Sequence, residues 1–306
     1  MLKNKKNVFI IAEAGVNHNG NLEIAKMLID VAAEAKVDAV KFQTFTAEKV
    51  VSKHAKKANY QSININDGDD SQFNMLKKLE LNHHDHMQIM AYCTKKKIKF
   101  FSTAFDVDGV NYLNDLGLDL FKIPSGEITN YPYLKAIALC GKPVIISTGM
   151  CAEYEIKECV DVLIKFGLSK EMISILHCNT EYPTPMKDVN LKAMLSIKNK
   201  FGVQIGYSDH TLGIEVPTAA VALGATIIEK HLTLNRLDGG VDSDFSMEPD
   251  EFAQILTRLT KMTHAPPWAT DNRPTGALMQ QTFETWITPI MIGGLIIFMC
   301  FIIIIS

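Results

Sequence analysis

The sequence lacks the features that mark several classes of protein. Its six cysteines form no Cys-x-x-Cys pair, which argues against a disulfide framework or a structural zinc site and fits a reducing cytoplasm. It has no basic stripe, and a net charge of -3 does not suggest a nucleic-acid partner. The N-terminal apolar run is short and leads into Glu13, so it resembles a first strand and not a signal peptide. With 47% hydrophobic and 21% charged residues, the chain has the composition of a globular protein with one large domain and a short appendage.

Eight short apolar runs recur along the chain, each rich in Ile, Val and Phe. They cover residues 8–15, 39–45, 99–104, 120–127, 143–150, 173–180, 203–209 and 226–233. Such nearly continuous apolar runs are typical of strands buried on both faces of a parallel sheet.

The segments between these runs have helical spacing. Residues 21–35 place Ile24, Leu28 and Val31 on one face, with Ala25 and Ala32 beside it. In residues 153–166 the corresponding face carries Ile156, Val160, Leu163 and Ile164. Eight strand–helix units predict a (β/α)8 TIM barrel; a doubly wound open sheet is the alternative, but it would be unusual with eight equivalent units.

Polar residues follow the predicted strands, where the active site of a barrel lies. Lys41 and Lys122 would supply positive charge there, and an unpaired buried ammonium is costly unless an anion compensates it. Hydroxyl donors for a phosphate or carboxylate come from four of the strand ends. These donors are Thr103, Ser125, Ser147 and Ser208.

Two histidines end the last two strands. Adjacent strands lie roughly 5 Å apart, so His210 and His231 could reach one metal ion. Asp209, Glu229 and Asp242 are near them in the sequence, and this set suits manganese, magnesium or another divalent ion. Two histidines with satisfied ring nitrogens are the alternative.

The other polar clusters receive simpler interpretations. The run Lys95–Lys97 is interpreted as a solvated helix end, and His83, His84 and His86 as surface residues of a polar helical stretch. His18, in a turn before a helix, could line the barrel mouth or cap the turn.

Together these segments resemble the N-acetylneuraminate (sialic acid) synthase family, which includes legionaminic acid synthases. The resemblance runs from about residue 7 to about residue 260, the whole predicted barrel. It rests on IAEAGVNHNG at 11–20, VKFQTF at 40–45, FSTAFD at 101–106, FKIPSGEITNYPYL at 121–134, GKPVIISTGM at 141–150, LHCNTEYPTP at 176–185, IGYSDHT at 205–211 and IEKHLTL at 228–234.

The resemblance implies a condensation of phosphoenolpyruvate with N-acetylmannosamine or a related N-acylated hexosamine. C3 of phosphoenolpyruvate attacks the sugar aldehyde, water adds at C2, and phosphate leaves by C–O cleavage, which yields a nonulosonic acid. A divalent metal, Mn²⁺ or Mg²⁺, polarises the aldehyde.

The resemblance also implies roles for individual residues. His210 and His231 correspond to the metal ligands, and Glu13 is also the candidate for proton transfer. Glu13 and Asp242 correspond to sugar-binding carboxylates, and Gln43 and Tyr182 to the lining of the sugar pocket. The phosphoenolpyruvate ligands correspond to Lys41, Thr103, Lys122, Ser125, Ser147 and Ser208, with Thr180 at a position that can be Asn in the family.

Two segments point to different branches of the family. SGEITN at 125–130 resembles the sialic and legionaminic branch, whereas DGGVDSDFSMEPDEF at 238–252 resembles the pseudaminic branch. The acceptor sugar is therefore left open between these branches.

The expected organisation is a barrel over residues 1–262, a linker over 263–284 and a hydrophobic tail over 285–306. The tail carries no charge, and about 20 residues at 1.5 Å each span ~30 Å, the length of a transmembrane segment. It is either an anchor for a cytoplasmic barrel or the end of a truncated chain. The resemblance also implies an antifreeze-like C-terminal domain that contributes an arginine across a homodimer, but the family pattern stops after Lys261, so this domain is expected to be absent. Activity is therefore in doubt, and an inactive membrane-tethered barrel is the alternative function.

Overall fold

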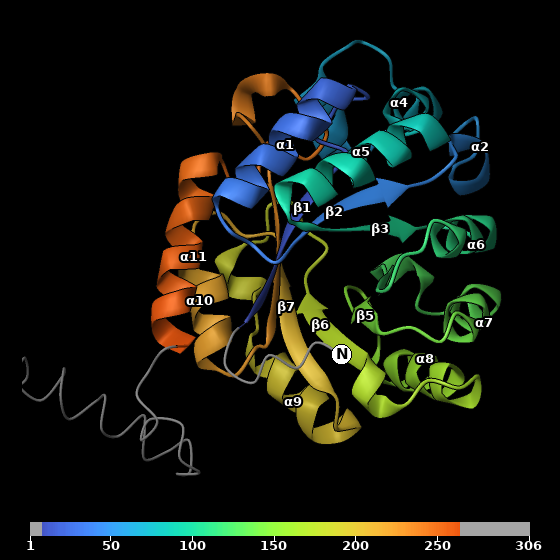
Figure 1. Cartoon of the computed structure of the whole chain (residues 1–306), viewed down its shortest axis with the longest axis vertical. Coiled ribbons are helices and arrows are strands. Elements are labelled where there is room, and N and C mark those ends of the chain that lie inside the picture. Colours follow the sequence, from blue (N-terminus) through green and yellow to red (C-terminus); the bar gives the residue numbers. More distant parts are fainter. Residues whose placement is uncertain (1–7, 264–306) are drawn as a thin grey trace, which may run out of the picture. The chain divides into compact units, whose positions relative to one another are not determined.

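The computed structural model describes residues 8–263, which form a closed barrel of eight parallel strands in sequence order (Figure 1). The strands are β1 (Phe9–Gly15), β2 (Ala39–Thr44), β3 (Lys99–Ala104), β4 (Phe121–Ile123), β5 (Val144–Ser147), β6 (Ile173–Cys178), β7 (Gln204–Asp209) and β8 (Ile227–His231). β8 pairs with β1, which closes the sheet and excludes the open alternative. The predicted TIM barrel is confirmed.

Helices surround the barrel on its outer side (Figure 1). The α-helices are α1 (Leu22–Glu34), α2 (Ala47–Val50), α3 (Asn59–Ile65), α4 (Gln72–Leu79), α5 (His83–Lys96), α6 (Val107–Asp115), α7 (Tyr131–Leu139), α8 (Glu153–Lys165), α9 (Lys192–Phe201), α10 (Glu215–Ala222) and α11 (Pro249–Thr263). Short 3-10 turns are η1 (Ser125–Glu127), η2 (Lys170–Met172), η3 (Met186–Asp188) and η4 (Arg236–Asp238). The connection from β2 to β3 is the most elaborate, because it carries α2, α3 and α4 before α5.

Five strands end earlier than their apolar runs predicted, β2 at Thr44 and β8 at His231 among them. β4 stops at Ile123 because Pro124 has no N–H for a sheet hydrogen bond, and the chain turns into η1. β5 stops at Ser147 and β6 at Cys178. The polar residues just beyond these ends therefore lie in loops at the barrel mouth.

Two predicted helices bury slightly rotated faces. In α1, whose N-cap Asn21 accepts hydrogen bonds from the amides of residues 23 and 24, Ile29 is fully buried while Ile24 and Val31 are only partly buried. In α8, Cys159 is buried and Ile164 is 37% exposed. Periodicity indicated the correct side of each helix, but contacts with the barrel decide which edge is covered.

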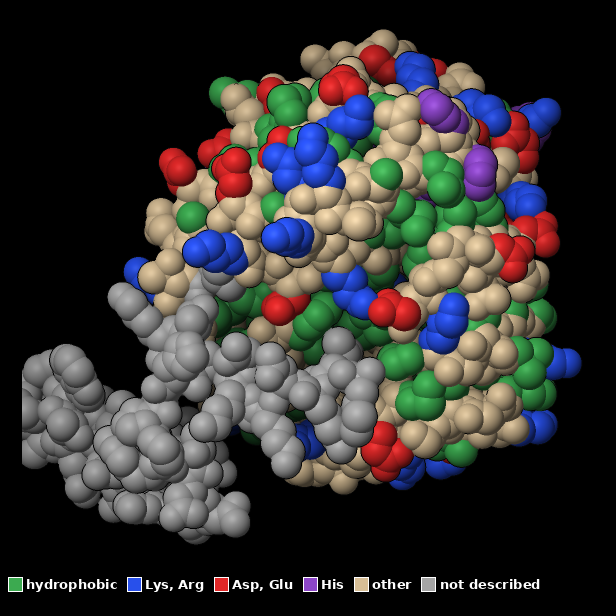
Figure 2. All heavy atoms as spheres, in the orientation of Figure 1, with side chains coloured by type: hydrophobic (Ala, Val, Ile, Leu, Met, Phe, Trp, Pro, Cys, Tyr) green, Lys and Arg blue, Asp and Glu red, His purple; other side chains and the backbone are tan. Residues whose placement is uncertain are grey.

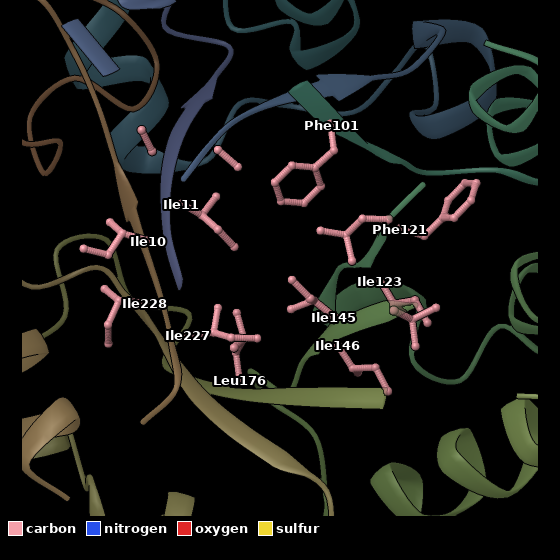
Figure 3. Close-up of a cluster of buried hydrophobic side chains, with 14 of the residues drawn as sticks. Ile10, Ile11, Phe101, Phe121, Ile123, Ile145, Ile146, Leu176, Ile227 and Ile228 are labelled. Carbon is pink, nitrogen blue, oxygen red and sulfur yellow. The ribbon is translucent and has the colours of Figure 1, made fainter. Parts of the chain in front are cut away.

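The inside of the barrel below the mouth is filled by apolar side chains. Ile11, Phe101, Ile145, Leu176 and Ile227 point into the enclosed space, whereas Ile10 and Ile228 lie on the outer side (Figure 3). Because side chains alternate along a strand, the residue two positions later faces inward again. The inward faces of β1, β3, β5 and β8 therefore continue from this apolar layer to polar residues at the mouth.

Replacing Gly206 in β7 with alanine is expected to destabilise the barrel by about 3 kcal/mol. A Cβ at this position would lie 2.3 Å from the Ile227 carbonyl oxygen and 2.5 Å from Leu176 Cδ2, and the carbonyl belongs to a neighbouring strand that cannot move freely. The matched control is Gly126→Ala, whose new Cβ would meet nothing within 4 Å. Equal urea unfolding midpoints for the two variants would contradict this account.

A second, smaller hydrophobic cluster joins the β2–β3 connection to the loop after β8. Its buried members are Val16, Phe45, Met75, Leu79 and Val241. Residues 47–79, which contain α2, α3 and α4, are called the β2–β3 cap below. This cluster holds the cap against the loops at the mouth end of β1 and β8.

The histidines outside the mouth differ in their surroundings. His83 and His84 are exposed as predicted, but the interpretation of His86 as a surface residue is wrong. His86 is buried, because its Nε2 lies 2.8 Å from Thr44 Oγ1 on the outer face of β2 and its Nδ1 lies 2.9 Å from the Asn82 carbonyl oxygen. His18 is also buried, and its Nδ1 accepts a hydrogen bond from the Gly20 amide, so it caps its turn.

Lowering the pH from about 6.5 to about 4 is expected to reduce the free energy of unfolding by up to about 3 kcal/mol through His18 alone. Burial lowers the pKa of His18 to about 4, so the unfolded chain binds the proton more readily than the folded chain. The stabilisation is complete above pH 6.5 and is lost as the pH falls towards 4. His18→Gln should flatten this part of a urea-unfolding pH profile, and His54→Gln, at an exposed position, should not. Parallel profiles for wild type and His18→Gln would rule the assignment out.

The surface carries charges of both signs. On the face shown in Figure 2, Lys and Arg side chains are interspersed with Asp and Glu side chains. Within residues 8–263, no helix is both long enough and apolar enough to cross a membrane. The predicted linker from 264 onwards and the predicted tail lie outside the described residues.

Candidate active site

Strand register brings the predicted mouth residues of β1 to β4 together. Glu13 pairs with Lys41, and Thr103 pairs with both Gln43 and Lys122. Lys41 Nζ lies 2.7 Å from Glu13 Oε2 and donates a hydrogen bond of 3.1 Å to Thr103 Oγ1. All but the half-buried Gln43 are buried, so these charges interact with little screening by water.

Glu229 of β8 lies between the two lysines. Lys122 Nζ is 2.7 and 2.9 Å from its two carboxylate oxygens, and Lys41 Nζ is 3.8 Å from Oε2. Ser208 Oγ donates to Glu229 Oε1 at 3.1 Å. The sequence interpretation placed Glu229 near the histidines but did not include it among the site residues. Its position two residues before His231, on the same face of one strand, was the available signal.

The pKa values of these groups follow from burial and from each other. Burial alone would raise the pKa of Glu229, but Lys122 and Lys41 lower it to about 2. Burial lowers the pKa of Lys122, whereas for Lys41 the carboxylates of Glu13 and Glu229 outweigh burial and raise it. Burial raises the pKa of Glu13 to about 7. When Glu13 is protonated, two ammonium groups face one carboxylate, and the net positive charge favours a bound anion.

Hydroxyl groups lie on the side of β4, β5 and β6. Ser125 Oγ accepts a hydrogen bond of 2.8 Å from the Gly149 amide. Ser147 Oγ is buried and has no hydrogen-bond partner among the described residues, so it is free to donate to a ligand. Thr180 packs close to Gly149, where a Cβ would lie 2.5 Å from Thr180 Cγ2. The lack of a side chain at residue 149 allows this loop to approach.

A corner of the mouth around Gly15 gathers three polar groups from three segments. A Cβ on Gly15 would lie 3.4 Å from Glu13 Oε1, 3.5 Å from Gln43 Nε2 and 3.7 Å from Asp242 Oδ2. Gly15 has a φ of +52°, which favours glycine, so the space between these groups stays open. Burial raises the pKa of Asp242 to about 7. A hydroxyl group of a ligand could donate to either carboxylate here.

The two predicted histidines lie side by side, with ring centroids 5.4 Å apart. His210 Nδ1 is 2.7 Å from the Asn179 carbonyl oxygen, which fixes Nδ1 as the donor and leaves Nε2 with a lone pair. His231 Nδ1 lies 3.8 Å from Asp242 Oδ2 and makes no hydrogen bond within residues 8–263. Burial lowers the pKa of His210 to about 4, and burial together with the neighbouring His210 lowers the pKa of His231 well below its usual value. Both rings are therefore neutral and able to bind a metal.

The metal-binding potential rests on this pair alone. Among the described residues, no group of three or more His, Cys, Asp or Glu is arranged to hold a metal ion. Asp209 does not join the pair, because it faces the outer side of β7, where its Oδ2 lies 2.6 Å from Lys230 Nζ.

Aromatic side chains enclose the histidines. The centroid of the Tyr182 ring lies 4.4 Å from that of His210 and 5.0 Å from that of Phe245. The centroids of the Phe245 and His231 rings are 4.9 Å apart. Tyr182 was predicted at the sugar pocket, but Phe245 was missed. It follows no strand and belongs to no spacing pattern, so only the folded loop after β8 reveals it.

The fold and the mouth define a (β/α)8 barrel whose C-terminal end combines two buried lysines and several hydroxyl groups with two neutral histidines. A sequence profile described as the NeuB family matches residues 28–266, and the chain belongs to this family. The resemblance to the sialic acid synthases is thereby confirmed.

Known proteins agree with this assignment. N,N'-diacetyllegionaminic acid synthase of Campylobacter jejuni is 50% identical over 260 residues, which cover 85% of this chain and 78% of that protein. The synthase of the same name from Legionella pneumophila is 47% identical over 251 residues, 81% of this chain and 70% of that protein. A crystal structure of N-acetylneuraminic acid synthetase from Leptospira borgpetersenii, in complex with citrate, has a TM-score of 0.75 at 35% identity and covers 92% of this chain and 93% of that one.

Proposed function

We propose that this chain condenses phosphoenolpyruvate with an N-acylated six-carbon amino sugar to give a nonulosonic acid and phosphate. The observation that carries the proposal is the pair Lys41 and Lys122, buried at the barrel mouth and bridged by Glu229. A product of the legionaminic type is favoured over the pseudaminic and N-acetylneuraminic types because of the 50% identical Campylobacter synthase.

Phosphoenolpyruvate would bind at the anion end of the mouth. Lys41 and Lys122 offer charge, and the Ser147 hydroxyl, which has no hydrogen-bond partner in the described part of the chain, offers a donor. Phosphate and carboxylate oxygens take such charge-assisted hydrogen bonds readily. The other hydroxyl groups assigned to this end are those of Thr103, Ser125, Thr180 and Ser208.

The amino sugar would bind at the Gly15 corner, with its hydroxyl groups on Glu13, Gln43 and Asp242 and its outer part beside Tyr182. C3 of phosphoenolpyruvate then bonds to the aldehyde carbon, water adds at C2, and the C2–O bond to phosphate breaks. Glu13, with a pKa raised to about 7 by burial, can accept or return a proton near neutral pH.

We propose His210 and His231 as the ligands of a divalent ion, Mn²⁺ or Mg²⁺. The donor set fits, because both rings are neutral and His210 is oriented by the Asn179 carbonyl. When bound, the ion would supply Lewis-acid polarisation of the sugar aldehyde.

The buried charges favour an acceptor without a phosphate group. In the described part of the chain, the buried lysines are Lys41, Lys57, Lys122 and Lys230, and no arginine is buried. Lys57 pairs with Asp67 and Lys230 with Asp209, so neither offers a second phosphate site.

The test is phosphate release by the purified chain with phosphoenolpyruvate, Mn²⁺ and a panel of N-acylated hexosamines, each with and without a 6-phosphate. We expect release with an unphosphorylated sugar, and mass spectrometry of the nonulosonic product then distinguishes the legionaminic and pseudaminic types. Omitting the sugar is the control. Absence of release with every sugar, while phosphoenolpyruvate still binds, would reject the proposed reaction for this chain.

A further inference from the structure

A tyrosine of the β2–β3 cap reaches the aromatic side chains at the mouth. The Tyr60 ring of α3 stacks on the Tyr182 ring, with centroids 5.7 Å apart and planes inclined by 29°. Tyr182 in turn lies against His210 and Phe245. The two tyrosines therefore form one continuous wall that begins on the cap and ends at the histidine pair.

The position of Tyr60 is held by contacts of the cap itself. Asn64 Nδ2, one turn further along α3, donates a hydrogen bond of 2.9 Å to the Val241 carbonyl oxygen. Lys57 Nζ, just before α3, is buried and lies 2.6 Å from Asp67 Oδ1. Tyr60 also packs against the small hydrophobic cluster that contains Val241. These contacts tie α3 to the loop that carries Asp242.

The electrostatic surroundings connect Tyr60 to the same corner of the mouth. Burial raises the pKa of Tyr60 to about 12, and the negative charge of Asp242 adds to this effect. The phenol therefore stays neutral at every pH at which the barrel would work, and its ring presents an ordinary aromatic face beside an acidic group.

We propose that Tyr60, together with Tyr182, is a specificity-determining residue that contacts the N-acyl group of the acceptor sugar. This inference rests on the proposed function. The hydroxyl groups of such a sugar find partners at Glu13, Gln43 and Asp242, which surround Gly15. The acyl methyl is the most apolar part of the sugar, and its burial against an aromatic face is favourable because both surfaces are removed from water.

Tyr60→Ala and Tyr60→Phe separate the ring from its hydroxyl group. Removing the ring should raise the KM for N-acetylmannosamine about tenfold while leaving the KM for phosphoenolpyruvate within about twofold. Tyr60→Phe keeps the ring and should behave like wild type. The matched control is Tyr154→Ala, because Tyr154 is an exposed tyrosine of α8, one of the helices on the outer side of the barrel.

The preference between acceptors with acyl groups of different size is a second readout. It should not change if Tyr60 only supports the structure of the cap. Tyr60→Ala leaves a space beside Tyr182, so the ratio of kcat/KM for N-propanoylmannosamine to that for N-acetylmannosamine should rise about fivefold over wild type. Calorimetric titration with N-acetylmannosamine measures the same loss of affinity without turnover. Circular dichroism verifies that each variant is folded.

The outcomes separate this inference from the proposed reaction. No turnover by wild type would reject the proposed reaction, and the calorimetric comparison of wild type with Tyr60→Ala would still decide the role of Tyr60. Turnover by wild type with an unchanged acceptor KM and acyl ratio in Tyr60→Ala would overturn the role of Tyr60 alone. Equal increases in the KM values for both substrates would also overturn it, because they would indicate a general loss of structure.

Discussion

Replacing Lys122 with alanine is expected to raise the KM for phosphoenolpyruvate about a hundredfold. Lys122 is buried, and its ammonium group is one of two that face the mouth. Its loss removes the proposed charge-assisted partner for the substrate anion and also leaves Glu229 with the Ser208 hydroxyl and with Lys41 at 3.8 Å. The KM is measured by phosphate release at saturating sugar, and Lys122→Met, which keeps most of the apolar stem, should show the same increase.

The matched control for Lys122 is Lys99→Ala. Lys99 is a partly exposed strand lysine, and its Nζ lies 2.6 Å from Asp119, so it has the same residue type and an ion pair but no place at the mouth. The KM of the Lys99→Ala variant for phosphoenolpyruvate should stay at the wild-type value. An unchanged KM in Lys122→Ala would remove this residue from the anion site.

Replacing His231 with alanine is expected to lower metal-dependent activity by at least about a hundredfold and to weaken Mn²⁺ binding, because one of the two proposed imidazole ligands is lost. The fold should persist, since His231 lies at the end of β8, above the apolar layer of the barrel. Calorimetric titration with Mn²⁺ measures the binding without reference to activity.

His84→Ala is the control for His231, because His84 is an exposed histidine of α5. It should bind Mn²⁺ as wild type does. Equal Mn²⁺ affinity in His231→Ala and wild type would exclude His231 as a ligand, and the pair would then be two buried histidines without a metal.

Much of this site could be predicted from the sequence, because the C-terminal ends of all strands in a parallel barrel lie at the same end of the molecule. Lys41 and Lys122 are 81 positions apart, but each lies on an inward strand face. Lys122 pairs with Thr103 in the register, and Lys41 Nζ donates a hydrogen bond to Thr103 Oγ1. The same alternation explains why Ser208 faces the mouth and Asp209 does not. The positions of the strands and the period of two along each strand were therefore enough to bring the predicted residues to one end of the molecule, although their roles stay predictions.

Other features of the fold were missed. His86 was placed on the surface because its neighbours are polar, but it shares the buried face of α5 with Ile89 and Cys93, and its ring contacts Thr44. Tyr60 reaches Tyr182 only because the cap docks on the loop after β8, through contacts such as that of Asn64 with Val241. Such docking depends on pairs of segments more than 100 residues apart and is invisible to periodicity.

The place of Glu229 between the lysines has a consequence for how the barrel binds. In the empty mouth this carboxylate acts as an internal counter-ion, so two ammonium groups can be buried before any substrate arrives. An incoming anion must then share the lysines with a negative group that stays behind. Glu229 therefore weakens the binding of anions at the mouth, but it stabilises the two buried lysines when no anion is bound. We expect the mouth to release phosphate more readily than a site in which the lysines had no carboxylate partner.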